Sequence, residues 1–398
     1  GFRLVDAEGA APEPQAAQQD VPAPAQGTLT LSGCYKAAAP ASNTVGQVVS
    51  ATGTVTFEDV TFLGSTMTVV SGDRLLHVSG ENDLSRTRLT IDVMTPNCVT
   101  GIVCAADATI VLGAIDLRGD KDGIGLTIGE GVTVKVVDRV NTTAPGDSLV
   151  VDGTLETAAI ETSSKIGDWA LDLIGIREEK PLTISGRGVV YTGILRFCRY
   201  GKILLDNVRV NFTTKWPLRH ELSETPDILA WPQLLGKGDV TLGGTTDWTI
   251  LPTDYYQKQT YVEVTAAGSV TWTFDTQDPR DASQTHTFTF HPSDMSDSAD
   301  GYCRQAITKV NPGVLRLGGR LLYSGNTTIR GGKIVKLSDL ETPNSKWVEE
   351  GGEVGLLVSY RAWNETTRQM EDRERDDAVL VTAETTTFEN GKWDAVTG

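Results

Sequence analysis

The stretch from Ile307 to Leu337 constrains the fold of this chain more than any other part of its sequence. Its apolar residues alternate in short runs, and glycines separate the runs, as at Gly318–Gly319 and Gly331–Gly332. Alternation with a period of two is typical of β-strands, and glycine supplies positive-φ turns between them. The step from Leu317 to Leu337 matches one coil of a β-solenoid, whose repeats are about 20 residues long. The pattern predicts stacked coils rather than helices.

The same alternation runs from Thr28 to about Thr214. Two segments in it, 57–62 and 205–210, share a strand, a corner made of an acidic and an Asx residue, and a new strand that begins at valine. Asp and Asn suit such corners because they tolerate bent backbones and hydrogen-bond them locally. We expect an all-β, right-handed parallel β-helix with inward stacks such as Val55, Phe57, Val60 and Phe62. The alternative is a β-sandwich, which needs tight hairpins, and the sole Asn-Gly pair is Asn390–Gly391.

Composition shifts divide the chain into four segments. Residues 1–27, rich in Ala, Pro and Gln, form a linker or an arm. Residues 28–214 are β-helix coils, residues 215–305 are an aromatic-rich inserted β and loop unit, and residues 306–398 are repeat-like coils and C-terminal capping strands. In the last segment, two apolar runs that begin near Val354 and Ala378 form a hairpin-like pair, separated by a charged loop tip at 368–377.

The charge of the chain excludes some partners. Its net charge of −17 would be repelled by a nucleic-acid backbone or an anionic membrane surface. It contains no apolar run of about 18 residues, so we expect no membrane insertion of this segment. Because the first residue is Gly1, we expect a processed or tagged start. Cys98 and Cys104 flank a short Gly-containing stretch and are a candidate disulfide in an exported protein.

Few residues point to catalysis. Carbohydrate-active β-helices use carboxylates on one long face, and the candidates here are Asp116, Asp120, Asp122, Glu156, Asp206 and Asp227. A solvated surface is the better explanation for each of them taken singly, and the sequence contains no nucleophile elbow, phosphate loop or HExxH motif. His286 and His291 would face opposite sides of a strand, which disfavours a shared metal. We therefore assign no catalytic residue, cofactor or metal.

Aromatic residues gather between 215 and 275. Exposed Trp and Tyr rings stack on sugars, so this cluster is the candidate ligand platform. The other interpretation, which we favour, is that the rings form the core of this segment. The candidate binding residues are Trp231, Trp248, Tyr255, Tyr256 and Trp272.

Residues 307–337 resemble the autotransporter-associated β-strand repeat of bacterial passenger domains. The matching positions are Lys309, Gly313, Leu315, Leu317, Tyr323, Gly325, Thr327 or Thr328, Ile329, Gly331, Gly332 and Ile334, whereas the family's Asn is displaced to Asn326. The resemblance implies a secreted or bacterial cell-surface β-helix for display or adhesion, with glycans or neighbouring cells as partners. Alternatives are a polysaccharide lyase or glycoside hydrolase on the same scaffold, and a structural subunit of a phage or surface assembly. The oligomeric state stays open.

Overall fold

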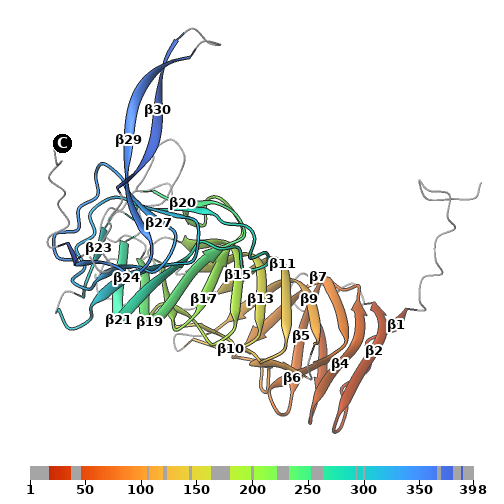
Figure 1. Cartoon of the computed structure of the whole chain (residues 1–398). Helices are drawn as coiled ribbons and strands as arrows, with labels where there is room; N and C mark the ends of the chain where they lie inside the picture. The colour runs from red at the N-terminus through yellow and green to blue at the C-terminus, as the bar shows by residue number, and fades with distance from the viewer. Residues whose placement is uncertain are drawn as a thin grey trace, which may run out of the picture.

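The chain forms a long parallel β-helix (Figure 1). A computed structural model describes residues 18–36, 46–104, 107–119, 123–142, 146–162, 180–198, 201–221, 233–251, 263–292, 294–298, 301–364, 369–379 and 387–388. These residues form 31 strands, and none of them is helical. The fold class predicted from the alternating pattern, an all-β parallel solenoid, is therefore confirmed.

Each coil visits three faces in turn, and several strands bend at a corner to serve two of them. Strands on both face 1 and face 2 are β2 (Leu29–Lys36), β4 (Val55–Phe62), β19 (Gln233–Gly244) and β21 (Glu263–Asp275). Strands on both face 2 and face 3 are β7 (Glu81–Asp92), β9 (Thr109–Arg118), β11 (Thr133–Thr142), β13 (Thr154–Thr162) and β15 (Val189–Cys198).

The remaining strands belong to one face each. Face 1 also contains β6 (Leu75–Ser79), β8 (Gly101–Cys104), β10 (Gly125–Ile128), β12 (Ser148–Val151), β14 (Leu182–Ser185), β16 (Lys202–Asp206) and β23 (Asp294–Ser296). Face 2 also contains β17 (Arg209–Phe212), β24 (Gln305–Val310), β26 (Thr327–Ile329) and β28 (Trp347–Glu349).

Face 3 runs in two sections. The first adds β3 (Gln47–Ala51), β5 (Thr66–Ser71) and β18 (Leu218–Glu221) to the bent strands. The second consists of β20 (Trp248–Ile250), β22 (Thr287–Phe290), β25 (Val314–Leu317), β27 (Lys333–Lys336) and the start of β29 (Glu353–Asn364).

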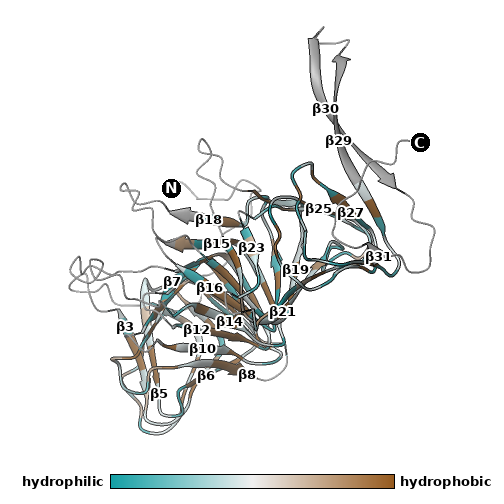
Figure 2. Ribbon diagram, turned by 90° about the vertical axis from the view of Figure 1, so that its left-hand side faces the viewer, coloured by the Kyte–Doolittle hydropathy of each residue, from teal (hydrophilic) through white to brown (hydrophobic). Residues whose placement is uncertain are grey.

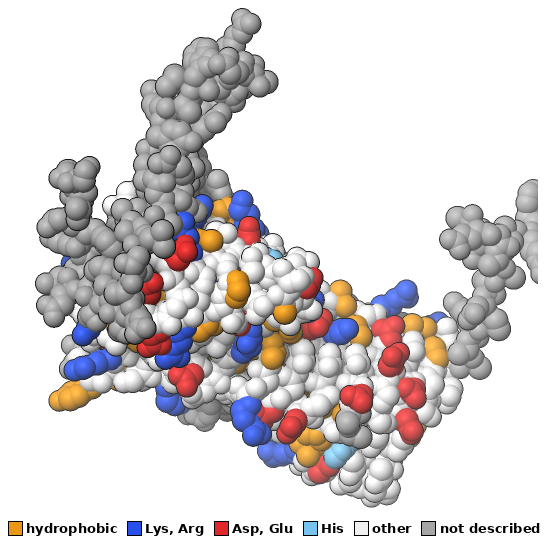
Figure 3. Space-filling view, in the orientation of Figure 1, with side chains coloured by type: hydrophobic (Ala, Val, Ile, Leu, Met, Phe, Trp, Pro, Cys, Tyr) orange, Lys and Arg blue, Asp and Glu red, His pale blue; other side chains and the backbone are white. Residues whose placement is uncertain are grey.

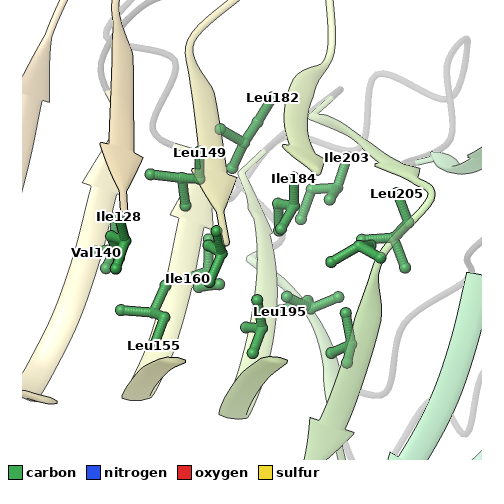
Figure 4. Packing of buried hydrophobic residues seen from close by; sticks show 14 of the residues in the cluster. Ile128, Val140, Leu149, Leu155, Ile160, Leu182, Ile184, Leu195, Ile203 and Leu205 are labelled. Atoms are coloured by element: carbon green, nitrogen blue, oxygen red, sulfur yellow. The ribbon is translucent and has the colours of Figure 1, made fainter. Parts of the chain in front are cut away.

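The core is a set of aliphatic stacks that run along the axis, because parallel in-register coils place like positions above one another. On face 1, Leu149, Ile184 and Leu205 are direct neighbours in register, and on face 3 so are Val140, Ile160 and Leu195. All are fully buried, and Figure 4 shows them facing one another across the interior. Figure 2 shows the same alternation, with hydrophobic segments recurring from strand to strand.

Two corners predicted to be alike have the same geometry. Asp59 and Asn207 both adopt a positive φ, of 51° and 48°. The Oδ1 atom of Asp59 accepts a hydrogen bond of 2.9 Å from the N–H of Glu81, and Oδ1 of Asn207 accepts one of 3.0 Å from the N–H of Asp239. Gly80 and Gly238 lie directly against these side chains: a Cβ atom there would come within 2.0 and 2.1 Å of the Oδ1 atoms. Only glycine fits at these two positions.

The aromatic-rich segment is built into the same stack. Strand β19 pairs with β16 and β17 on one side and with β21 on the other, so its strands continue the coils instead of forming a separate unit. Trp248 and Trp272 have no exposed surface. Trp248 stacks on Phe288 with ring centroids 4.4 Å apart, and Nε1 of Trp272 donates to Oε1 of Gln305 at 2.7 Å.

The ligand-platform prediction is therefore wrong for Trp248 and Trp272, because buried rings cannot stack on a sugar. Both side chains point to the inner side of their strands, so these two rings belong to the core, the other interpretation of this cluster. The other three candidates, Trp231, Tyr255 and Tyr256, lie outside the described residues.

The predicted disulfide between Cys98 and Cys104 is not formed. Cys104 ends strand β8, in register with Val78, whereas Cys98 lies in the preceding corner and bridges to Val70 on face 3. The Cys98 sulfur is buried and accepts a hydrogen bond of 3.3 Å from the N–H of Asp92. Burial raises the pKa of the thiols of both Cys98 and Cys104, so both favour the protonated form.

The C-terminal end of the solenoid carries a long antiparallel hairpin. Strand β29 pairs in parallel with β27 from Glu353 to Leu356, and from Val354 to Asn364 it pairs antiparallel with β30 (Gln369–Val379). Figure 1 shows this hairpin projecting away from the coils. A hairpin-like pair was predicted here, but with the run from Ala378 onward as its second strand. Residues 369–377, predicted as the loop tip, instead form most of β30. Strand β31 (Thr387–Phe388) pairs antiparallel with β28.

The N-terminal arm is described from residue 18 onwards. Strand β1 (Gln19–Asp20) pairs in parallel with the end of β2, and Ala25 bridges to Ala51 of face 3. These contacts place the end of the predicted arm against the first coil.

Candidate functional site

The outer side of face 3 carries a row of polar residues on six successive coils. Register pairs join Thr90 to Asp116, Asp116 to Asn141, Asn141 to Glu161, Glu161 to Arg196 and Arg196 to Arg219. The first five of these residues each lie between two buried residues of their strand, so they point away from the core, and Arg219 is exposed. The second outward row, one step nearer the corner with face 2, reads Arg88, Ala114, Arg139, Ala159 and Ile194.

Arg88, Arg139 and Arg196 of these rows pair with carboxylates of neighbouring coils, and Arg118 pairs with Asp116 of its own strand. Asp116 Oδ2 lies 3.1 Å from Nη1 of Arg88 and 3.6 Å from Nη2 of Arg118. Glu161 lies 2.7 Å from Nη1 of Arg196 and 3.4 Å from Nε of Arg139. The small side chains of Ala114 and Ala159 leave room for the arginine side chains to lie across them. We call Arg88, Arg118, Arg139, Arg196, Arg219, Asp116 and Glu161 the arginine ladder.

The two signs of charge occupy different depths in the ladder. The Asp116 and Glu161 side chains are only 4% and 9% exposed, whereas those of Arg88, Arg118, Arg139 and Arg196 are 29–50% exposed. A buried carboxylate is tolerated because it is paired. Each guanidinium has five N–H donors, and one carboxylate contact leaves several of them for an external acceptor. The surface of the ladder is therefore rich in cationic donors.

The chain elsewhere is strongly acidic, with a net charge of −17. Figure 3 shows acidic side chains gathered over the N-terminal coils. On strands β7 to β15, Asp92 is in register with Arg118 and Asp138 lies 3.9 Å from Nε of Arg139, so this face carries both signs of charge and is not simply acidic. Face 3 differs from the acidic N-terminal coils because it carries charges of both signs and its guanidinium groups point outward.

Two buried polar atoms in the row have no hydrogen-bond partner in the described part of the chain. They are Oγ1 of Thr90 and Oδ1 of Asn141. Both flank Asp116, and Nδ2 of Asn141 donates to Oδ1 of Asp116 at 3.4 Å. An unpaired buried polar atom costs free energy, so this part of the row has hydrogen-bonding capacity that the protein itself does not use.

The predicted carboxylate candidates do not converge on one site. Asp116 is in the arginine ladder on face 3, Glu156 is on face 2, and Asp206 ends a strand of face 1. Glu156 pairs with Nη2 of Arg280 at 3.0 Å, and Asp206 pairs with Nζ of Lys237 at 2.8 Å. The remaining candidates, Asp120, Asp122 and Asp227, lie outside the described residues.

The histidines form pairs with carboxylates. His286 Nε2 lies 3.1 Å from Asp278, and His291 Nε2 lies 2.6 Å from Asp339. His77 contacts Asp73, whose other oxygen accepts from the Ser71 hydroxyl. This order places the aspartate between serine and histidine, so the histidine is not positioned to activate the serine, as a catalytic triad requires. In the described ranges, no group of three or more His, Cys, Asp or Glu side chains could hold a metal.

The sequence analysis did not identify the arginines of the ladder as a site, although a three-residue pattern in the sequence indicates the rows that contain most of them. Once the coils are aligned, the segments Ala114–Asp116, Arg139–Asn141, Ala159–Glu161 and Ile194–Arg196 share one pattern, an outward residue, a buried aliphatic residue and a polar residue. The alignment requires knowing the length of each coil. Coils of unequal length hide it from a search with a fixed period.

Comparison with known proteins yields no match: none of the family models fits the chain, and neither the curated proteins nor the solved structures contain a similar one. No helix in the described part of the chain has the length and apolar character needed to cross a bilayer.

Proposed function

We propose that this chain is a secreted or cell-surface display protein that binds an acidic polysaccharide lengthwise along face 3. The observation that supports it is the arginine ladder, in which half-exposed guanidiniums lie above buried carboxylates on successive coils. Arginine binds carboxylate and sulfate groups with two parallel hydrogen bonds, which suits uronic acids and sulfated sugars.

The spacing of the ladder suits a linear polymer. Neighbouring strands of a sheet lie about 4.8 Å apart, which is close to the length of one sugar unit in an extended chain. A polysaccharide that runs along the axis would thus meet a new coil at about every sugar. The binding energy would come from many weak contacts, as is expected of a display or adhesion surface.

One observation favours hydrolysis as a second candidate function. Asp116 and Glu161 are separated by the coil of Asn141, which places their backbones about 10 Å apart, near the separation that inverting glycosidases use. Both carboxylates are held by arginines, which favours binding over acid–base work.

The test measures retention of the purified protein on immobilised polygalacturonate, a sulfated glycan and neutral dextran, at low and high salt. We expect retention on the acidic polymers that salt abolishes. Arg88→Gln and Arg139→Gln each leave the buried carboxylate one arginine, so the fold should survive, and the double variant should bind about tenfold more weakly.

Arg187→Gln is the matched control, because Arg187 is 85% exposed and pairs with Asp152 away from face 3. Equal retention on dextran, or an equal loss in the control, would refute the proposal. Release of oligosaccharides that stops with Glu161→Gln would establish the hydrolase instead.

A further inference from the structure

The last coils of the solenoid contain a hollow of about 590 Å³. It lies at the corner between face 2 and face 3, beside the base of β29. Four of its lining residues are glycines on successive coils, Gly313, Gly332, Gly351 and Gly352. Because glycine has no side chain, the backbone itself forms much of the wall, and the volume falls in the range of small-molecule sites.

Two carboxylates face this hollow. Glu349 ends strand β28 and Glu353 begins strand β29, and both line it. The Oε2 atom of Glu349 is buried and has no hydrogen-bond partner among the described residues. Burial raises the pKa of the Glu349 carboxyl, and the nearby charge of Glu353 raises it further. An unpaired carboxylate oxygen next to a second carboxylate calls for a cationic donor.

Among the charges around the hollow, Lys333 stands in register with Glu353, whereas Oε2 of Glu349 has no hydrogen-bond partner in the described part of the chain. Lys333 is the one cationic side chain among the lining residues, against two carboxylates. Glu350, the residue after Glu349, points to Arg330 instead, with Oε2 2.8 Å from Nε. Lys309 lies beneath Gly332 but is fully buried, and its Nζ atom donates to the carbonyl oxygens of Val310, Asn311 and Gly331.

We propose that this hollow is a binding site for a small polar molecule that carries a protonated primary amine, with Glu349 and Glu353 holding the ammonium group. The amine would donate to Oε2 of Glu349, and the hydroxyl groups of such a molecule would reach the backbone that the glycines leave open. A divalent metal is a poorer fit, because the described lining offers only two acidic side chains.

Calorimetry of the whole chain with glucosamine, N-acetylglucosamine, glucose and cadaverine tests this site. Acetylation removes the charge of glucosamine and keeps the ring. We therefore expect glucosamine to bind at least tenfold more tightly than N-acetylglucosamine and glucose. Cadaverine separates the two sources of an amine: equal binding identifies a linear amine site, and weaker binding identifies an amino sugar site. Equal affinity for glucosamine and its acetylated form, or no binding of either amine, would overturn the proposal.

Three variants locate the site. Glu349→Gln and Glu353→Gln remove one charge each and should weaken amine binding by about tenfold or more. Glu350→Gln is the control, because that carboxylate belongs to Arg330. Val314→Trp keeps every charge and fills the hollow, so it should abolish binding while thermal unfolding stays close to that of the wild type. Unchanged affinity in both Glu349→Gln and Val314→Trp would refute this location. None of the substituted residues belongs to the arginine ladder, so the amine site and the proposed polysaccharide binding are tested independently.

Discussion

Lys309 shows how a charged residue is accommodated inside this solenoid. It is fully buried, and its ammonium group donates to three backbone carbonyl oxygens. Burial lowers the pKa of Lys309 to about 8, and the charge of Asp275 opposes this shift. Lys336 has a pKa of about 8 as well, through burial. Tyr323 is shifted the other way: burial raises its pKa to about 12.

These pKa values predict a stability maximum in alkaline solution. Between pH 8 and 10.5 the folded state binds fewer protons at the two lysines than the unfolded state, so the free energy of unfolding should rise with pH, by a few kcal/mol. Between pH 10 and 12 the folded state keeps the Tyr323 proton that the unfolded state loses, so stability should fall again. Urea unfolding at pH 7.5, 9.5 and 11.5 measures this pH dependence of the free energy of unfolding. A curve that declines steadily from pH 8 would contradict the assignment to the lysines.

Trp272 is a second residue whose role follows from its position. It alternates with Thr271 and Thr273 along β21, and it is fully buried. We expect Trp272→Ala to lower the free energy of unfolding by about 3–5 kcal/mol, because it leaves a large cavity. Thr271→Ala, on the outer side of the same strand, should cost less than about 1 kcal/mol. Equal losses in urea unfolding would mean that the inward side of β21 is misassigned.

At the scale of elements, the corners explain why so much of the fold was visible in the sequence. Asn207 combines a positive φ with a side-chain hydrogen bond to the next coil. Asn207→Ala loses both the hydrogen bond and the tolerance for this backbone conformation, so we expect a loss of about 2 kcal/mol. Asn207→Gly keeps the tolerance and should cost less. Urea unfolding of both variants measures the two free energies of unfolding and checks this order. A larger loss in the glycine variant would contradict the reasoning.

Local signals of this kind predicted the strands and the corners, but they placed the second strand of the final hairpin too late in the sequence. They worked because alternation and turn residues act over a few residues. The arginine ladder and the hollow could not be predicted in the same way, because each joins residues from coils that are about 20 or more residues apart. The sequence left two roles open for the tryptophans, core and ligand platform, for a related reason: which side of a strand faces inward depends on its register with neighbouring coils.

At the scale of the whole molecule, each coil contacts only its neighbours, so stability should vary along the axis. Coils in the middle, such as those of β9 to β15, have a neighbour on both sides of every strand. Among the described residues, the outer edge of β2 on face 1 has none. We expect amide hydrogen exchange to be slowest in β9–β15 and faster in β2 and β3. Uniform exchange rates would indicate a single cooperative unit instead.

The direction of the hydrogen bonds gives the solenoid a mechanical property. Its backbone hydrogen bonds run along the axis, so tension applied at the two ends stretches them directly and would detach one coil at a time. Thr133 and Thr154, on neighbouring coils, are 21 residues apart. A coil of that size adds about 5 Å to the folded length but releases about 70 Å of extended chain when it detaches. A protein of this design anchored at one end would yield in steps under load, and each step would lengthen the connection before it breaks.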